Sequence, residues 1–412
     1  MIDLRHEIIQ LFSCVSDFKS YCSSHKLMNF KGSIRSKLPT VGTTIFTVMS
    51  AYAREHEAIN LSQGFPDFQP DPILQSAVGH AIKNGHNQYA PMAGLMSLRE
   101  GIAAKVDKLY HADVNPESEI TITAGGTQAL FTAIAAMISE NDEVILFSPA
   151  YDSYAPAVEL AGGKTIHYNM EAPDFAINWK QVQKLITQRT RMIVINSPHN
   201  PTGTTLTEKD MKELEKLTKD SDIIILSDEV YEHIIFDGLT HQSVLSYPAL
   251  AERSMVIGSF GKTYHATGWK VGYCIAPREL TVEFRKVHQF NVFSVSSPMQ
   301  HAYAEILQHP HIYQELGTFY QQKRDFFRNA IKGSKFELID CKGTYFQLVN
   351  YNKISEEKDT DFVKWLTREW KVAAIPVSVF YHRYLDQKII RFCFAKENDT
   401  LEKAAEKLCK IK

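Results

Sequence analysis

Short apolar runs alternate with longer amphipathic segments between about residues 60 and 290, and this alternation constrains the fold more than any other feature of the chain. The segments between the runs, such as TQALFTAIAAMI from Thr127 and EKDMKELEKLTK from Glu208, carry apolar residues at helical spacing. Most of the runs are apolar throughout, which is typical of strands covered on both faces. The repetition predicts an α/β fold with a mostly parallel sheet. The clearest runs are 120–123, 144–147, 192–195, 223–226, 255–257 and 271–276.

Residues 299–412 have a different pattern. Helical spacing around 300–307, 321–333 and 401–409 surrounds the strand-like pieces GTYFQLVNY, KVAAIPVSVF and KIIRFCFA. This mixture predicts a smaller α+β domain packed on the first. We therefore divide the chain into an N-terminal extension (1–27), an N-terminal arm that contributes to the small domain (28–60), a large domain (61–298) and a small C-terminal domain (299–412).

Composition excludes several classes of protein. The 412 residues carry 45 Lys and Arg against 47 Asp and Glu, a formal net charge of −2. This balance gives no electrostatic basis for binding nucleic acid or an anionic membrane surface. No apolar run approaches the ~20 residues that span a bilayer. The six cysteines form no CxxC pair, so we expect no disulfide scaffold and a cytoplasmic location.

Polar or glycine-rich stretches follow five of the apolar runs. In open α/β sheets, ligands bind beyond the carboxyl ends of the strands, so these stretches are expected to converge on one crevice. In chain order they are AGGTQ, SPAYDSY, NSPHNPTG, SDEVY and GSFGKTYHATGWK.

The stretch AGGTQ has two interpretations. Gly125 and Gly126 permit close backbone approach, and Thr127 and Gln128 offer N–H groups where a helix dipole favours an anion. The stretch is then a phosphate cradle. Alternatively it is a tight turn between strand and helix, with Thr127 as the N-cap.

Lys262 lies in the most informative stretch. A partly dehydrated lysine has a lowered pKa and can form a Schiff base with a carbonyl, and Ser259 and Lys270 could bind a phosphate on the same ligand. Asp228, just after the run 223–226, is either the partner of a cation or the start of a loop. Tyr231 either points into the same crevice or packs. An exposed loop lysine is the alternative for Lys262.

Asn200 and Arg391 are further candidates. The Asn200 amide either donates to a ligand oxygen or stabilises the turn at Asn200-Pro201. Arg391 lies in the apolar run IIRFCFA, and a buried arginine needs an anionic partner. That partner is either a structural carboxylate or a substrate carboxylate bound bidentately.

One ligand accounts for all these groups together. It has a phosphate, an aldehyde for a lysine, a ring nitrogen for an acid and a ring oxygen for hydrogen-bond donors. These are the groups of pyridoxal 5′-phosphate (PLP), for which a lysine Schiff base and an acid at the pyridine nitrogen are expected. We therefore predict PLP as the cofactor, and no metal.

The ordered motifs resemble the fold-type I, class I PLP-dependent aminotransferases, from about residue 38 to the end of the chain. The stretches SKLPTVGTTIF, INLSQGFPDF, NQYAPM, PHNPTG, SDEVYEHI, SFGKTYHATGWKVGY and IPVSVF are similar to the branch containing methionine and kynurenine (glutamine-type) aminotransferases. The resemblance implies a PLP-binding large domain with a mostly parallel seven-stranded sheet, joined to a smaller α+β domain.

The resemblance also implies roles for individual residues. Lys262 would bind the cofactor and act as acid and base, and Asp228 would keep the ring nitrogen protonated. Tyr231 and Asn200 would bind the ring oxygen, and Tyr151 would stack on the ring. The remaining contacts would come from Gly126, Thr127, Gln128, Ser259 and Lys270 at the phosphate, from Arg391, Asn200 and Gly64 at the substrate carboxylate, and from Tyr89 at the phosphate of the neighbouring subunit in a homodimer.

The implied reaction is a ping-pong transfer of the amino group from an L-amino acid to a 2-oxo acid. Aromatic residues expected near the site favour apolar, thioether or aromatic donors: methionine first, then phenylalanine, tyrosine, leucine, glutamine and kynurenine. These residues are Phe65, Tyr151, Tyr264, Phe293, Phe380 and Tyr381. Two alternatives remain open, a β-lyase for cysteine conjugates on the same cofactor and a non-catalytic aminotransferase-like ligand-binding domain.

Two positions depart from the pattern of many class I members. Lys270 stands where many carry arginine, so an ammonium makes a point contact instead of a forked one. This branch commonly has lysine there, so cofactor binding is still expected. His265 stands where many have a small residue, and it either touches substrate or is a packed loop histidine.

Overall fold

The structure, a computed structural model, describes residues 30–412. The extension 1–27 therefore lies outside the described residues. Contacts along the chain divide it after Pro39 into the units Met1–Pro39 and Thr40–Lys412. Residues 30–39 include no helix or strand, so every element below belongs to Thr40–Lys412.

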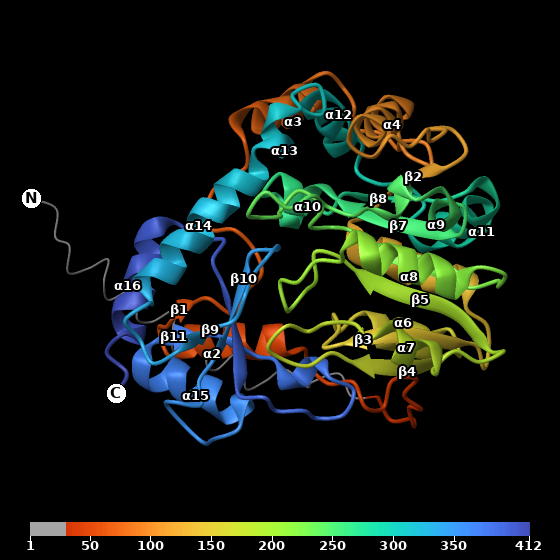
Figure 1. The fold of residues 1–412 in the computed structure, drawn as a ribbon. Helices are drawn as coiled ribbons and strands as arrows, with labels where there is room; N and C mark the ends of the chain where they lie inside the picture. The colour runs from red at the N-terminus through yellow and green to blue at the C-terminus, as the bar shows by residue number, and fades with distance from the viewer. Residues whose placement is uncertain (1–29) are drawn as a thin grey trace, which may run out of the picture. The chain divides into compact units, whose positions relative to one another are not determined.

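A seven-stranded sheet forms the centre of the larger part of this unit (Figure 1). Only β8 is antiparallel to its neighbours, and the remaining strand pairs are parallel. The predicted α/β fold with a mostly parallel sheet is therefore confirmed. In spatial order the strands are β2 (Ile120–Thr123), β8 (Gly272–Ile275), β7 (Ser254–Ser259), β6 (Ile224–Asp228), β5 (Thr190–Asn196), β3 (Glu143–Ser148) and β4 (Lys164–Asn169).

Two hydrophobic cores cover the two faces of this sheet. Ile145 and Phe147 of β3 pack into one core, and Val144 and Leu146 pack into the other. This alternation explains why the strands are apolar throughout. Helices α5 (Gly126–Met137), α6 (Tyr154–Leu160) and α11 (Arg278–Asn291) contribute to the second core. The first core takes residues from α3 (Pro72–Lys83), α4 (Met96–Tyr110), α7 (Trp179–Gln183), α8 (Glu208–Thr218), α9 (Pro248–Ala251), α12 (Ser297–Ile306) and α13 (His311–Gln314).

A second, antiparallel sheet has its own core, packed with the N-terminal helix α2 (Ile45–Glu55) and with helices of the C-terminal part (Figure 1). Its strands in order are β12 (Ile375–Pro376), β13 (Ile389–Cys393), β10 (Phe346–Asn350) and β9 (Glu337–Leu338). A separate parallel pair joins β1 (Ile59–Asn60) to β11 (Val372–Ala373). The expected strand KVAAIPVSVF is thus divided, because its two halves pair with different strands. The packed C-terminal helices are α14 (Leu316–Ala330), α15 (Asp359–Trp370) and α16 (Asn398–Leu408).

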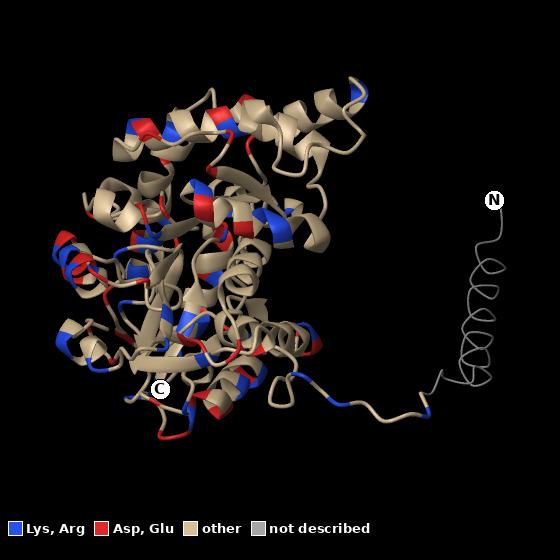
Figure 2. Cartoon of the chain, turned by 90° about the vertical axis from the view of Figure 1, so that its right-hand side faces the viewer, with Lys and Arg blue, Asp and Glu red and all other residues tan. Residues whose placement is uncertain are grey.

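Charged residues of both signs are interspersed along the helices of Thr40–Lys412 (Figure 2). This distribution agrees with the near-zero net charge of the chain. Among the described residues, no helix is both long and apolar enough to cross a membrane.

Candidate active site

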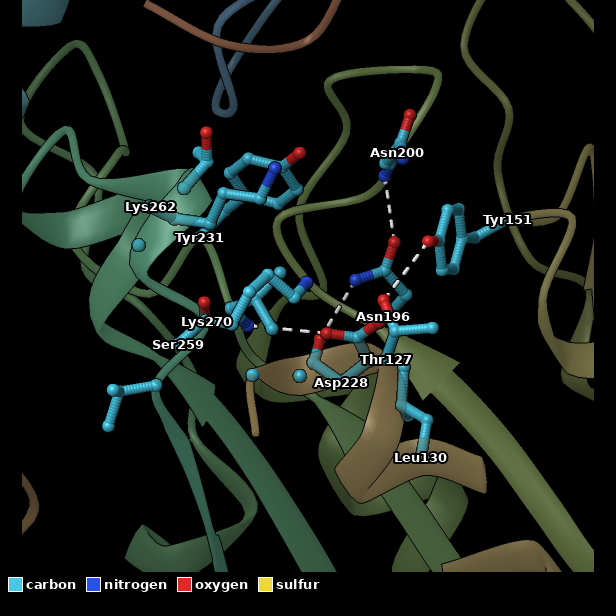
Figure 3. Close-up of a pocket in the computed structure, with 16 residues that line it drawn as sticks. Thr127, Leu130, Tyr151, Asn196, Asn200, Asp228, Tyr231, Ser259, Lys262 and Lys270 are labelled. Atoms are coloured by element: carbon cyan, nitrogen blue, oxygen red, sulfur yellow. Dashed lines mark hydrogen bonds between the residues drawn. The ribbon is translucent and has the colours of Figure 1, made fainter. Parts of the chain in front are cut away.

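A cavity lies beyond the carboxyl ends of the parallel strands, where the sequence predicted a crevice. Its lining brings together residues from all five polar stretches (Figure 3). The lining residues are Gly125, Gly126, Thr127, Leu130, Tyr151, Asn196, Asn200, Asp228, Val230, Tyr231, Ser259, Gly261, Lys262, Thr267, Lys270 and Val271.

One end of the cavity is formed by the start of α5. Its N-cap is Gly125 at φ 82°, so the alternative with Thr127 as N-cap is wrong. A Cβ on Gly125 would lie 3.2 Å from the Lys270 Nζ, which shows how closely the ammonium approaches this backbone. The unpaired N–H groups of the first turn, the Lys270 charge and the Thr127 hydroxyl together form an anion site.

The side chain of Gln128 turns away from this site. Its Oε1 accepts from the Ala124 N–H at 2.9 Å, and its Nε2 donates to the Thr132 hydroxyl at 2.6 Å. Gln128 does not line the cavity. The side chain is committed to the turn before α5, and the phosphate contact predicted for Gln128, through its backbone N–H, stays a prediction.

Lys262 lies in the short helix α10 (Phe260–Thr263), directly after β7. Its Nζ donates to the Tyr345 hydroxyl at 3.0 Å and to the Gly64 carbonyl at 3.4 Å. The pKa of the amine is lowered to about 8, mainly by burial, with the charges of Lys270 and Arg391 acting in the same direction and Cys393 and Asp228 acting against it. The alternative of an exposed loop lysine is therefore wrong, and an amine of this kind suits covalent chemistry with a carbonyl.

Asp228 is the last residue of β6, because Ser227 and Asp228 continue the pairing with β5. It is 4% exposed, and burial raises the pKa of its carboxyl to about 6. The Tyr154 hydroxyl donates to Oδ2 at 2.6 Å, and the Val230 N–H donates to Oδ1 at 3.3 Å. A buried acid aimed into a cavity suits a cationic ring nitrogen, and the alternative of a simple loop start does not apply.

Asparagines connect the acid to the arginine. The Asn196 Nδ2 donates to the Asp228 carbonyl at 2.9 Å, and the Asn196 Oδ1 accepts from the Asn200 N–H at 2.8 Å (Figure 3). The Asn200 Oδ1 in turn accepts from the Arg391 Nη1 at 2.6 Å. These contacts join the cavity wall at Asn196 and Asn200 to Arg391 of β13, which does not itself line the cavity.

Arg391 is the largest fully buried side chain, at 1% exposure. Its guanidinium lies 3.8 Å from the Phe346 ring centroid, and its Nε has no hydrogen-bond partner. Burial lowers the pKa of this group to about 10. Arg391 is absent from the ion pairs found among residues 30–412, so the structural-carboxylate alternative is not supported.

Other expected residues lie elsewhere. Of the six aromatic residues expected near the substrate, only Tyr151 lines this cavity. Tyr264 packs on Phe260 and Tyr303, and the Tyr381 hydroxyl donates to the Met170 carbonyl at 2.6 Å. His265 packs edge-on against Phe68, with ring centroids 4.7 Å apart, so it is a packed loop histidine.

Three residues of the site were not predicted from the sequence. Asn196 was hidden at the start of NSPHNPTG, where Asn200 drew attention by preceding a proline. Tyr154 and Tyr345 carry no local signal, because only the fold brings their hydroxyls to Asp228 and Lys262. Tyr154 follows the end of one strand and Tyr345 precedes another, and these positions were the only indications in the sequence.

The chain matches the family "Aminotransferase class I and II" over residues 56–408. Methionine aminotransferase of Escherichia coli is 50% identical over 91% of this chain and 97% of that protein. Human kynurenine–oxoglutarate transaminase 1 is 32% identical, over 87% of this chain and 94% of that protein. A crystal structure of the Escherichia coli methionine aminotransferase superposes with a TM-score of 0.90 at 49% identity, over 92% of this chain and all of that one.

The chain therefore belongs to the class I and II aminotransferases. The expected resemblance, the fold-type I architecture and the enzymatic activity of amino-group transfer are confirmed by these matches. The alternative of a non-catalytic ligand-binding domain is wrong.

Proposed function

We propose that this enzyme binds PLP and transfers the amino group of an apolar, thioether or aromatic L-amino acid to a 2-oxo acid. Methionine is the favoured donor, followed by phenylalanine, tyrosine, leucine, glutamine and kynurenine. The observation that carries the proposal is the cavity in which the Lys262 amine, the buried acid Asp228 and the anion site of α5 face one space. The names of the relatives support methionine and kynurenine as donors.

The residues present fit this cofactor. An aldehyde needs a neutral amine, a pyridine nitrogen needs an acid, and a phosphate needs backbone N–H groups and a cation. Lys262, Asp228, and α5 with Ser259 and Lys270 supply these three, and Tyr231, Asn200 and Tyr151 line the space between them. When bound, PLP supplies an electron sink that stabilises the carbanion left when the substrate loses its α-proton.

The chain's own residues then have distinct tasks. With the cofactor bound, the Lys262 amine would take the proton from the substrate's α-carbon and, as an ammonium, would deliver it to the former carbonyl carbon of the cofactor, which suits a pKa of about 8. Asp228 would stabilise positive charge on the ring nitrogen. Tyr231 would donate to the ring oxygen, since burial raises the pKa of its hydroxyl and keeps it protonated.

Arg391 is proposed to bind the substrate's α-carboxylate. Its unpartnered, buried Nε and its contact with Asn200 leave the guanidinium oriented but not neutralised. A carboxylate that accepts two of its N–H groups would satisfy it bidentately. The backbone near Gly64 lies on the same side, because the Ser62 carbonyl accepts from the Arg391 Nη2 at 3.4 Å.

A homodimer with shared active sites is part of the proposal. Tyr89 is 81% exposed and meets the ring of Phe293, which is 58% exposed. Exposed aromatic pairs of this kind mark interaction surfaces. Light scattering would test the dimer, and Tyr89→Phe is expected to weaken PLP binding if its hydroxyl reaches the partner's phosphate. The domain boundaries and the cytoplasmic location stay predictions.

An absorption spectrum of the purified full chain tests the proposal. We expect a band from bound PLP that shifts when methionine is added without any 2-oxo acid, and that returns when a 2-oxo acid is supplied. A shift with phenylalanine, glutamine or kynurenine alone would correct the donor. Release of pyruvate from a cysteine conjugate without an acceptor would indicate the β-lyase reaction. Absence of a band with added PLP would overturn the proposal.

A further inference from the structure

Tyr345 lies directly before β10 and has no exposed surface. Its hydroxyl donates to the Gly64 carbonyl at 2.6 Å and accepts from the Lys262 Nζ at 3.0 Å. Because its single proton is used on Gly64, the oxygen can only accept from the lysine. The Lys262 Nζ also lies 3.4 Å from the Gly64 carbonyl, so each of the three groups contacts the other two.

The surroundings hold this hydroxyl in place. The Tyr345 ring packs edge-on against Tyr231 and Phe346, with centroids 5.2 and 4.9 Å away. Its carbonyl accepts from the Phe394 N–H at 3.0 Å. A Cβ on Gly64 would lie only 2.9 Å from the Phe346 ring, so the backbone that carries this carbonyl packs closely on that ring. The acceptor is therefore preorganised.

The Lys262 amine is free in this geometry. It must also be free whenever the substrate's nitrogen takes its place during the reaction. A lysine has four rotatable bonds, so a free amine needs a partner to stay near the substrate's α-carbon. Asp228 is not within ion-pair distance of it, and no carboxylate among residues 30–412 is.

We propose that Tyr345 is a positioning residue. Its hydroxyl holds the free Lys262 amine beside the Gly64 loop, in position for proton transfer. The inference rests on the proposed function. The proton balance is simple: the amine would take one proton from the substrate's α-carbon and, as an ammonium, would pass it to the former carbonyl carbon of the cofactor, while the Tyr345 proton stays on its own oxygen. Burial raises the pKa of Tyr345 well above its usual value, so this hydroxyl acts as a neutral acceptor.

The hydrogen bond between Tyr345 and Lys262 also affects the pKa of the Lys262 amine. An ammonium gains more than a neutral amine from an oxygen acceptor, so Tyr345 favours protonated Lys262. The other groups that face the amine are Cys393 and Asp228, which favour the ammonium, and Lys270 and Arg391, which oppose it. The Tyr231 ring also lies 5.4 Å from the Nζ. Removing the Tyr345 oxygen alone should lower the amine's titration midpoint.

Tyr345→Phe tests this role, with Tyr351→Phe as its matched control. Tyr351 is equally buried, and its hydroxyl donates to the Glu357 carbonyl at 2.8 Å, away from the cavity. In the cofactor-free full chain, acetylation of Lys262 by acetic anhydride is followed by mass spectrometry from pH 6 to 10, a range of about two units on either side of the expected midpoint. We expect a lower midpoint in Tyr345→Phe and an unchanged one in Tyr351→Phe.

Steady-state kinetics of the PLP-loaded variants give the second readout. We expect kcat of Tyr345→Phe to fall ~10- to 100-fold, with KM changed far less, because the lost interaction orients the reacting amine. A wild-type midpoint, a wild-type kcat, or a change confined to KM would overturn the proposal. If the wild type transfers no amino group, the proposed function fails, and the labelling of the cofactor-free chain still decides the role of Tyr345.

A second variant tests the proposal in case Tyr345→Phe does not fold. Incorporating 3-fluorotyrosine at position 345 keeps the ring and hydroxyl, makes the O–H a stronger donor to Gly64 and weakens the oxygen as an acceptor. The Lys262 midpoint should shift in the same direction by a smaller amount. An unchanged midpoint in this variant would overturn the proposal.

Discussion

Lys105 is buried and Lys262 is partly buried, and the surroundings of the two amines are opposite. The Lys105 Nζ lies 2.6 Å from Glu232 Oε1 and donates to the Tyr273 hydroxyl at 2.6 Å. The Lys262 Nζ meets only a hydroxyl and a carbonyl. A buried ammonium is stable beside a carboxylate, whereas one without a carboxylate tends to lose its proton. Lys105 is therefore suited to a structural ion pair, and Lys262 is suited to act as a reactive amine.

One segment separates the two lysines. Asp228, Val230 and Tyr231 line the cavity. Glu229 and Glu232 point the other way, where Glu229 binds His241 at 2.8 Å and Glu232 binds Lys105. The stretch SDEVYEH thus supplies reactive groups to one side and paired charges to the other. The ion cluster anchors the backbone that carries the reactive residues.

Lys262→Ala should give the largest effect on activity. Loss of the covalent attachment and of the acid–base amine is expected to reduce turnover by at least ~10⁴-fold, since acid–base catalysis alone contributes ~10²–10⁴. Stability should not fall, because no ion pair is broken. Stopped-flow absorbance and thermal melting measure the two effects, with the exposed Lys332→Ala as control. Turnover near that of the wild type would disprove the role of Lys262.

Lys105→Met should give the largest effect on stability. It leaves Glu232 buried at 7% exposure without its cation, which costs about 3–5 kcal/mol of unfolding free energy. Denaturant unfolding measures the loss. A change below about 1 kcal/mol would show that Glu232 finds enough support from Tyr110 and Tyr273.

Asp228→Asn should reduce turnover without a comparable loss of stability. The amide keeps the shape and the Tyr154 contact but cannot stabilise a cationic ring nitrogen, and removal of one preorganised electrostatic group costs ~10²–10³ in kcat. Steady-state rates and PLP titration measure the effect. If kcat is unchanged, Asp228 does not serve the ring nitrogen.

His233 should give the smallest effect, a change in the pH dependence of stability. Burial lowers the pKa of this histidine to about 3, whereas in the unfolded chain it is about 6.5. Between these pH values the unfolded state binds one more proton than the folded state. The contribution of His233 to the free energy of unfolding is therefore fully present above about pH 6.5. It falls as the pH is lowered, by at most about 1.4 kcal/mol per pH unit. In unfolding curves from pH 7 to 4 (about that same window), His233→Asn should flatten the slope. The exposed His80→Asn should leave it unchanged, and an unchanged slope in His233→Asn would contradict the assignment.

The sequence predicted the site residues at strand ends better than the site residues that other parts of the fold contribute. Asp228, Ser259 and the Gly125–Gly126 turn follow apolar runs, and parallel pairing brings such ends to one edge. Tyr154 and Tyr345 were missed because contacts distant in sequence leave no local periodicity.

The sequence by itself determined the α/β class, the order of the strands along the chain and the group of reactive residues, because periodicity and strand-end chemistry are local properties. Only the tertiary structure decided which buried lysine stays unpaired, how Arg391 lies on Phe346 and which tyrosine meets the reactive amine. Protonation and proton transfer depend on distances between side chains and on their removal from water, and folding alone sets those quantities.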